Sequence, residues 1–238
     1  MNTSVTRETR FIDLGLIDYQ QAWDYQAQLL KEISGLKLAN RGIPDSDRRP
    51  TANYLIFCEH PHVFTLGKSG DIGNLRIHKE DLARIQANFV HTNRGGDITY
   101  HGPGQIVVYP VVDLDNFFTD IHRYMRTLEE SVILTLAELG IHGGRINGLT
   151  GVWLDPDDPL RARKICAMGV KMSRWITQHG LALNVNPDLS YFDHIIPCGI
   201  QDKKVTSIER ETGVADMQGV KEILIRMIAS QFDMTLVK

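Results

Sequence analysis

Apolar residues are spaced in two ways along the chain, and each spacing predicts one type of element. Short runs in which apolar residues alternate with polar ones, or follow one another directly, predict β-strands. These runs cover residues 11–17, 54–58, 63–66, 88–92, 106–112, 151–154, 164–172, 175–178 and 180–185. Apolar residues that return every three or four positions predict long helices over 19–35, 117–139 and 217–232, and short ones after His78 and over 189–194.

Polar, glycine and proline residues predict where these elements end. Asp18 and Asn116 are suited to cap the first two long helices, because their side-chain oxygens accept hydrogen bonds from free backbone N–H groups. Residues 1–9 predict a loose tail, and residues 36–51 predict an exposed loop long enough to be an insertion. Gly143-Gly144 and Gly148 predict turns, and residues 155–159 predict a tight loop.

The order of these elements predicts the fold class. Strands and helices mingle without a regular strand–helix alternation, so a doubly wound parallel sheet is not expected. We predict an α/β (α+β) fold with a mixed β-sheet flanked by helices. The chain of 238 residues is long enough for one sizeable domain and short for two, so residues 1–238 are predicted to form a single domain.

Composition narrows the class of protein. The chain has 42% hydrophobic and 23% charged residues, as ordinary globular proteins do. Its net charge of −3 argues against a general nucleic-acid binder. The N-terminus lacks the apolar segment of a signal peptide, and no apolar run approaches the roughly 18 residues of a membrane span. We therefore expect a cytoplasmic protein that does not bind a membrane.

The three cysteines differ in setting. An odd number of cysteines in a chain of this size does not make a disulfide framework, so reduced thiols are expected. Cys58 lies inside an apolar run and is predicted to be a core residue, which is the best interpretation of an arbitrary cysteine. Cys166 alternates within a predicted strand and is predicted to lie in the core or on a sheet face. Cys198 stands between Pro197 and Gly199, where a bend displays the side chain. It is therefore the candidate nucleophile.

Lys164 is the candidate partner of that cysteine. With Arg161 and Arg163 it could instead form a solvated charged strand edge, and the residues alone favour that interpretation. The small residues of the following segment, 167–169, however, suit the wall of a narrow pocket. A lysine at the mouth of such a pocket would favour a thiolate and could relay protons, as acyl transfer requires.

The segment 94–105 is rich in glycine and predicts a ligand loop. Adjacent glycines let a ligand approach the backbone, and the planar fork of Arg94 can bind a carbonyl, carboxylate or phosphate. A simple hairpin connection is the alternative, although four glycines together with Arg94 and His101 exceed what a hairpin needs. The segment matches neither a P-loop nor the G-x-G-x-x-G fingerprint.

A metal site is not expected. Glu59, His60 and His62 are close in sequence, but Pro61 interrupts the helix on which paired histidine ligands often lie, and there is no second cluster at ligand spacing.

Several motifs together resemble one family. They are R-G-G-D-I-T-Y-H-G-P-G-Q at 94–105, K-I-C-A-M-G-V at 164–170, H-G-L-A-L-N at 179–184, P-C-G-I at 197–200, and E-H-P-x-V-x-T-L-G at 59–67. Their order and spacing are similar to those of the octanoyltransferases of lipoate synthesis (lipoyl/octanoyl transferases). The resemblance covers most of residues 10–230.

The resemblance implies a fold like that of biotin and lipoate protein ligases, and it implies roles for residues. Cys198 would carry the acyl group as a thioester, and Lys164 would be its catalytic partner. The expected substrate-binding residues, which would line the acyl pocket, are Arg94, Gly95, Gly96, Asp97, Ile98, Thr99, Tyr100, His101, Ala167, Met168, Gly169, Gly180, Leu181 and Ala182.

The resemblance also implies substrates and partners. The donor would be octanoyl-acyl carrier protein, and the acceptor a lysine on lipoyl domains of 2-oxoacid dehydrogenase E2 subunits or on glycine cleavage H protein. We expect a monomer, and no cofactor or nucleotide. Because the carrier protein is acidic, a basic patch is expected near the pocket mouth, with Lys68, Arg76, Arg145 and Arg174 as candidates.

Three alternatives remain open. An ATP-dependent lipoate or biotin protein ligase would share the fold and need no nucleophilic cysteine. A cysteine hydrolase would use a histidine base such as His179 or His194. A non-catalytic lipoyl-domain binder would form no acyl adduct.

Overall fold

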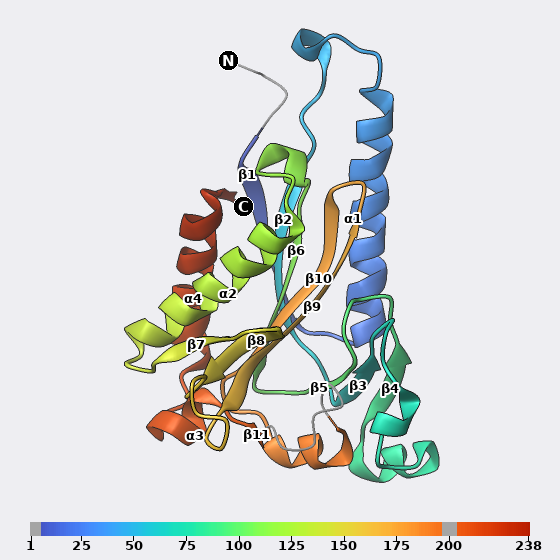
Figure 1. Cartoon of the computed structure of the whole chain (residues 1–238). Coiled ribbons are helices and arrows are strands. Elements are labelled where there is room, and N and C mark those ends of the chain that lie inside the picture. The colour runs from blue at the N-terminus through green and yellow to red at the C-terminus, as the bar shows by residue number, and fades with distance from the viewer. Residues whose placement is uncertain (1–5, 197–203) are drawn as a thin grey trace.

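The computed structural model describes residues 6–196 and 204–238. One large mixed sheet is sandwiched between helices, with α1 on one face and α2 and α4 on the other (Figure 1). Its strands lie in the order β12-β1-β2-β6-β10-β9-β8-β7, and β11 pairs with β9. Their bounds are β1 Glu8–Leu16, β2 Asn53–Glu59, β6 Gln105–Val111, β7 Gly143–Ile146, β8 Leu149–Leu154, β9 Arg163–Ser173, β10 Ile176–Asn184, β11 Lys204–Val205 and β12 Thr235–Val237.

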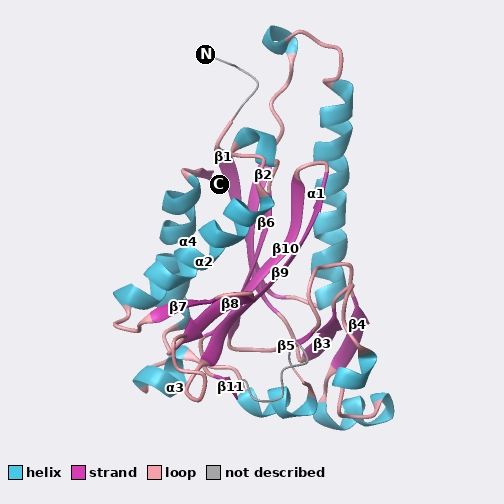
Figure 2. Cartoon of the chain, viewed as in Figure 1, coloured by secondary structure: helices cyan, strands magenta, loops and turns pink. Residues whose placement is uncertain are grey.

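The large sheet is mixed because β1 is parallel to both of its neighbours, whereas β2, β6, β10, β9, β8 and β7 pair antiparallel in turn. A second, smaller sheet has the order β4-β3-β5, with β3 Val63–Leu66, β4 Asn88–His91 and β5 Ile98–His101. It lies below the start of α1 in Figure 2. The predicted mixed sheet flanked by helices is confirmed.

The helices cover both faces. The α-helices are α1 Tyr19–Ala39, α2 Ile121–Glu138, α3 Ile208–Thr212 and α4 Met217–Phe232, and the short 3-10 helices are η1 Asp45–Asp47, η2 Ile72–Asn74, η3 Lys79–Ile85, η4 Leu114–Asn116 and η5 Leu189–His194. Asp18 caps α1 as predicted, because its carboxylate accepts from the backbone N–H groups of Gln20 and Gln21. The bounds of α4 are those predicted. Within the described residues, none of the helices combines the length and apolarity needed to cross a bilayer.

Strand β2 shows why its sequence is a continuous apolar run. Leu55 and Phe57 are fully buried against the side of α2 and α4, while Tyr54, Ile56 and Cys58 are buried against α1. A strand covered on both faces needs apolar side chains at every position. The run therefore reports a central strand.

Two helix boundaries differ from the prediction. Helix α1 continues through Gly35 to Ala39, so the loop predicted over 36–51 begins at residue 40. Beyond Gly35 the helix is fastened by Lys37, whose Nζ lies 2.6 Å from Asp113 Oδ1 and 2.9 Å from the carbonyl oxygen of Arg174. These contacts offset the roughly 1 kcal/mol that glycine costs a helix relative to alanine.

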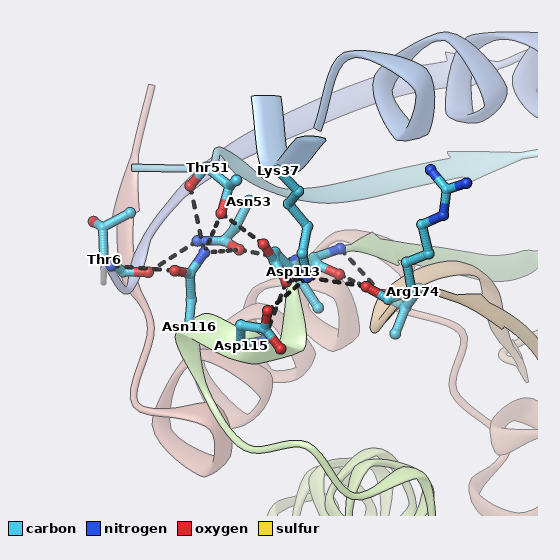
Figure 3. A network of polar contacts seen from close by, with 10 residues as sticks. Thr6, Lys37, Thr51, Asn53, Asp113, Asp115, Asn116 and Arg174 are labelled. Carbon is cyan, nitrogen blue, oxygen red and sulfur yellow. Dashed lines mark hydrogen bonds and ion pairs between the residues drawn. The ribbon is translucent and has the colours of Figure 1, made fainter. Parts of the chain in front are cut away.

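Asn116 does not cap α2. The cap is Asp120, whose carboxylate accepts from the N–H groups of His122 and Arg123. Asn116 instead ends η4, and its amide donates to Thr51 Oγ1 at 3.0 Å and to Asn53 Oδ1 at 3.1 Å. Figure 3 shows these residues in one polar network with Lys37 and Asp113. The Asn116 side chain is buried, so tertiary contacts rather than helix capping use its amide.

Three segments predicted as loops, turns or breaks belong to strands in the structure. The separate strands predicted at 175–178 and 180–185 are one strand, β10, in which His179 pairs with Val170 and Gly180 with Gly169. Residues 98–101, predicted within a ligand loop, form β5, and the turn predicted at Gly143–Gly144 lies in β7. In each case pairing with a neighbouring strand overrides the local preference of glycine for turns.

Candidate active site

A cavity of about 470 Å³ is lined by β9, β10, β6, β8 and the segment leading into β5. Of the residues predicted to act there, it is lined by Lys164 together with Arg94, Gly95, Gly96, Asp97, Ile98, Thr99, His101, Ala167, Met168, Gly169, Gly180, Leu181 and Ala182. Its volume is within the range of about 300–1,000 Å³ that small-molecule pockets span. Cys198 lies outside the described residues.

The glycines of two motifs let the loop at Arg94 pack directly on the sheet. The N–H of Gly95 donates to the carbonyl oxygen of Val170 at 2.9 Å. A Cβ on Gly169 would stand 2.8 Å from the carbonyl oxygen of Gly95, and one on Gly180 would stand 2.0 Å from that of Val108. Side chains at these two positions would push backbones apart, so the small residues bring the cavity walls together.

Arg94 lines the cavity and is held in place by hydrogen bonds to the protein itself. Its guanidinium donates from Nη2 to the carbonyl oxygen and Oγ1 of Thr65, at 2.6 and 2.8 Å, and from Nη1 to the carbonyl oxygen of Gly95 at 3.0 Å. These bonds hold the loop against β3 and keep a buried positive charge beside the cavity. The fork thus binds the protein's own carbonyls at these positions, where the sequence suggested a ligand.

Tyr100 does not line the cavity. Its side chain is fully buried in the core of the small sheet, with its hydroxyl 2.8 Å from His62 Nδ1 and its ring stacked on that of Tyr191. Successive side chains of a strand point to opposite faces. In β5 this alternation turns Tyr100 into the small-sheet core and His101 toward the cavity.

Buried histidines and tyrosines gather at the cavity, where Tyr19, His101 and Tyr109 line it and His60 contacts all three. The rings of Tyr19 and His101 are stacked, with centroids 5.7 Å apart. His60 is bonded through Nδ1 to the carbonyl oxygen of Ile17 and through Nε2 to the Tyr109 hydroxyl, both at 2.7 Å. Burial lowers the pKa of His60 and His101, and burial raises the pKa of Tyr19 to about 12. These rings are therefore neutral near pH 7.

The same contacts occupy the residues considered for a metal. Both ring nitrogens of His60 are engaged, and the ring of His62 stacks on Tyr191 with centroids 4.1 Å apart. Across the parts of the chain that the structure describes, no group of three or more histidine, cysteine or carboxylate side chains is arranged to hold a metal ion.

His179 has a strained backbone and a weakly basic ring. Its φ of 61° is in the left-handed region, and its N–H donates to Gln26 Oε1 at 2.8 Å. Ring atom Nε2 lies 2.8 Å from Asn93 Oδ1. Burial, followed by the charge of Arg94, lowers its pKa to about 3. A histidine of such low pKa is a poor general base, and His194 does not line the cavity.

His179 makes stability depend on pH. Its pKa is about 3 in the folded state against 6.5 unfolded, so only the unfolded state takes up the proton between these values. Stability is full above pH 6.5 and is lost as pH falls toward 3. At pH 5 this one residue should cost about 2 kcal/mol of unfolding free energy.

The measurement is urea unfolding of wild type and His179→Asn at pH 7.5 and pH 5, because asparagine tolerates the left-handed backbone. The loss of unfolding free energy between the two pH values should be about 2 kcal/mol smaller in the variant. Equal losses in the two proteins would contradict the assignment.

Lys164 is held on both sides. In β9 it pairs with Trp153 of β8 and with Val205 of β11, and its carbonyl oxygen accepts from the Thr206 N–H at 2.9 Å. Its Nζ lies 4.6 Å from the centroid of the Trp153 ring. A cation over an indole face is attracted by the ring quadrupole, so the ammonium has a defined place at the cavity.

Gly151 and Glu129 support this end of the cavity. Gly151 has a φ of 113°, and a Cβ there would stand 2.5 Å from the carbonyl oxygen of Cys166 and 3.6 Å from Lys164 Cε. The Gly151 N–H donates to Glu129 Oε1 at 3.0 Å, and Glu129 Oε2 is bound by Arg126 and Arg145. The buried carboxylate thus fastens β8 to α2.

Cys58 is a core residue, as predicted, and Cys166, predicted to lie in the core or on a sheet face, is a core residue as well. Both are free and buried, and burial raises the pKa of each thiol. A buried thiol of raised pKa is a poor nucleophile at neutral pH.

The four cations predicted for a basic patch lie in different places. Arg145 is bound to Glu129 and Glu130. Arg174 follows β9 at the turn into β10, where its carbonyl oxygen accepts from Lys37 near the C-terminal end of α1 (Figure 3). Tyr19, at the opposite end of this 21-residue helix, lines the cavity. Since such a helix is about 30 Å long, Arg174 lies far from the cavity. Arg76 lines a second groove near the cavity, and Lys68 follows β3, its backbone bonded to Arg94.

Other residues that line the cavity were not among the predicted binding residues, although Val170, His179 and Asn184 belong to the motifs. They are Tyr19, Ser69, Val107, Tyr109, Met125, Gly148, Leu149, Thr150, Trp153, Val170, Asn184, Phe192, Lys204 and Val205, besides His179. The run at 151–154 predicted a strand but not which side chains face the cavity. A register shift between Val152 and Trp153 breaks the alternation from which facing is inferred.

Comparisons with known proteins agree on one family. Residues 18–229 match the model of the lipoyl protein ligase A/B catalytic domain. A protein named octanoyltransferase from Cytophaga hutchinsonii is 57% identical over 98% of this chain and 96% of its own. Another of that name, from Flavobacterium johnsoniae, is 55% identical over 98% of this chain and all of its own.

Solved structures share the fold at low identity. A bipartite lipoate protein ligase from Thermoplasma acidophilum, solved in a study that included its E2 lipoyl domain, has a TM-score of 0.69 at 16% identity over 97% of this chain and 86% of its own. Biotin protein ligase from Aquifex aeolicus has a TM-score of 0.53 at 15% identity over 94% of this chain and 70% of its own. The biotin and lipoate ligase fold predicted from the motifs is confirmed.

Proposed function

The chain belongs to the lipoyl protein ligase A/B catalytic family and, within it, to the octanoyltransferases, and we propose that it takes octanoyl groups from octanoyl-acyl carrier protein through a thioester on Cys198. Octanoyl transfer in protein lipoylation follows from family membership. The acyl donor, the covalent intermediate and the choice of acceptor are the proposal. The single observation that carries it is that Lys164 lines the cavity, with its ammonium held over the Trp153 ring.

The first step forms the acyl-enzyme. The Lys164 ammonium favours the Cys198 thiolate, which attacks the carbonyl carbon of the octanoyl thioester. The bond from that carbon to the carrier sulfur breaks, and the leaving thiolate takes a proton from Lys164. Exchange of one thioester for another is nearly balanced in free energy, so this step needs no nucleotide.

The second step forms the amide. The amine of the acceptor lysine attacks the Cys198 thioester, the carbon–sulfur bond breaks, and neutral Lys164 accepts the proton of the attacking amine. We propose lysines on lipoyl domains of 2-oxoacid dehydrogenase E2 subunits and on glycine cleavage H protein as acceptors. The ligase from Thermoplasma acidophilum, which was studied together with its E2 lipoyl domain, supports this class.

The cavity wall supports an acyl substrate. Val107, Leu149, Met168 and Leu181 are apolar residues of the lining, and the neutral rings of His101 and His179 add no net charge. A saturated chain has no hydrogen-bonding groups, so burial against such walls is its main source of binding energy. The protein would act as a monomer in the cytoplasm, where its free cysteines stay reduced.

One experiment separates this function from an ATP-dependent ligase of the same fold. The protein is mixed with octanoyl-acyl carrier protein without ATP, and its intact mass is measured. We expect an added octanoyl group that hydroxylamine removes and that peptide mapping places on Cys198. Adding a lipoyl domain should then move the group onto the acceptor lysine.

Three other outcomes of this experiment would each indicate a different function. A ligase would give no adduct under these conditions, and would modify the lipoyl domain only with free octanoate and ATP. Release of free octanoate without transfer to the lipoyl domain would indicate a hydrolase. Absence of any adduct, with binding to the lipoyl domain retained, would indicate a silent binder.

A further inference from the structure

A second groove of about 910 Å³ adjoins the cavity and shares Phe192, Lys204 and Val205 with it. Because β11 pairs Val205 with Lys164, this groove approaches the cavity beside the proposed catalytic lysine. Its walls come from segments far apart in sequence, including Arg76, Arg161 and Arg210. A partner seated in this groove would reach Lys164 from the side of β11.

The groove carries unbalanced positive charge. Arg163 is neutralised, since its guanidinium is bound to both Glu211 and Asp155. Arg76, Lys204 and Arg210 are exposed and form no ion pair with another described residue, and Arg161, 3.4 Å from Asp155, keeps a side chain that is 70% exposed. The whole chain has a net charge of −3, so this local excess runs against the overall balance.

An apolar anchor lies beside these cations. Leu160 is 88% exposed, which makes it the most exposed of the large hydrophobic side chains in the described ranges. An exposed leucine next to arginines is what a protein partner with an acidic, partly apolar surface would bury. A small anion would make no use of it.

We propose that Arg76, Arg161, Arg210 and Leu160 form the docking site for the acidic acyl carrier protein that brings the octanoyl group; this inference rests on the proposed function. Charge complementarity selects an acidic partner. Between donor and acceptor, the groove favours the donor. A carrier protein delivers its acyl group on a long prosthetic arm that must lie along the enzyme to reach the cavity, whereas an acceptor lysine has a short reach.

The test compares two donors. Three residues that do not line the acyl cavity are reversed together in the variant Arg76→Glu/Arg161→Glu/Arg210→Glu. The control variant is Arg84→Glu/Arg226→Glu, at two exposed arginines outside the groove. The rate of octanoyl-enzyme formation is measured with octanoyl-acyl carrier protein and with octanoyl-pantetheine, a small neutral donor.

We expect kcat/KM for the carrier protein to fall by about 10- to 100-fold in the groove variant and to stay within about twofold in the control. The rate with octanoyl-pantetheine should not change. Raising the salt concentration should slow the wild-type reaction with the carrier protein and leave the small donor unaffected. Leu160→Ser, which adds no charge, should weaken only the carrier reaction.

Each other outcome overturns the docking site. Equal losses with both donors would mean that the substitutions damage the cavity, and no loss would mean that the carrier binds elsewhere. Slower transfer from octanoyl-enzyme to the lipoyl domain, with normal acylation, would assign the groove to the acceptor. Failure of the proposed function looks different, because wild type would then form no adduct with either donor.

Discussion

Replacing Cys198 with alanine is expected to abolish octanoyl transfer. The variant loses the sulfur that would carry the acyl group, and neither other cysteine can substitute, because Cys58 and Cys166 are buried with raised pKa values. Loss of a covalent nucleophile typically lowers kcat by about 10⁴- to 10⁶-fold. The check is the initial rate of lipoyl-domain octanoylation from octanoyl-acyl carrier protein, together with the intact mass of the variant.

Cys166→Ala is the matched control. It removes a thiol three positions from Gly169 on the same strand as Lys164, and it keeps the cysteine at position 198. This variant should keep its octanoyl adduct and most of its rate, although it should unfold more easily because a buried atom is lost. A Cys198→Ala protein that still octanoylated a lipoyl domain without ATP would refute the thioester mechanism.

The second large effect is expected at Lys164. In Lys164→Ala both half-reactions should slow by about 10²- to 10⁴-fold, the range of general acid–base catalysis. The thiolate loses its cation in the first half, and the attacking amine loses its proton acceptor in the second. Rapid-mixing measurements of adduct formation, and of its decay on adding a lipoyl domain, separate the two.

Lys164→Arg divides these roles. Arginine keeps the positive charge and can stack on Trp153, but it does not give up its proton near neutral pH. Acylation should therefore recover more than transfer to the lipoyl domain does. Lys171→Ala, at the other end of β9 and outside the cavity, is the control. Unchanged rates in Lys164→Ala would remove this lysine from the mechanism.

The sequence predicted the central elements well for a physical reason. Strands β2 and β6 are covered on both faces, so their buried side chains form continuous apolar runs, which differ from the three- or four-residue spacing of the helices. Helix α4 was predicted to the residue, since its buried positions Val220, Leu224 and Ile228 repeat every four residues and Asp216 caps it. Patterns of this kind are local and can be read without the partner elements.

The failures come from contacts between distant segments. Gly35 does not end α1 because Lys37, two positions on, is fastened to Asp113, 76 residues away. His179 does not interrupt β10 because it pairs with Val170 and bonds to Gln26 and Asn93. Nothing near these residues in sequence signals such partners.

The candidate site was predicted in part for the same reason. The motifs located the loop at Arg94 and the small residues of β9 and β10, because clustered glycines typically mark places where two backbones approach closely. Tyr100 was wrongly included, since a motif does not reveal which way each strand residue faces. Trp153 and Met125 were missed because they belong to β8 and α2, and no motif covers these two elements.

The two outermost strands of the large sheet have a consequence for self-association. β12 has three residues and β7 has four, and the pairing of β7 shifts register after Gly144. A sheet edge displays unpaired backbone groups that can recruit a strand from another chain, and a short or irregular edge offers too few of them. The long apolar strands β2, β6 and β10 are thereby kept out of reach in the middle of the sheet. Damage that detaches β12 from β1 should therefore appear first as aggregation of the protein, before its chemistry is impaired.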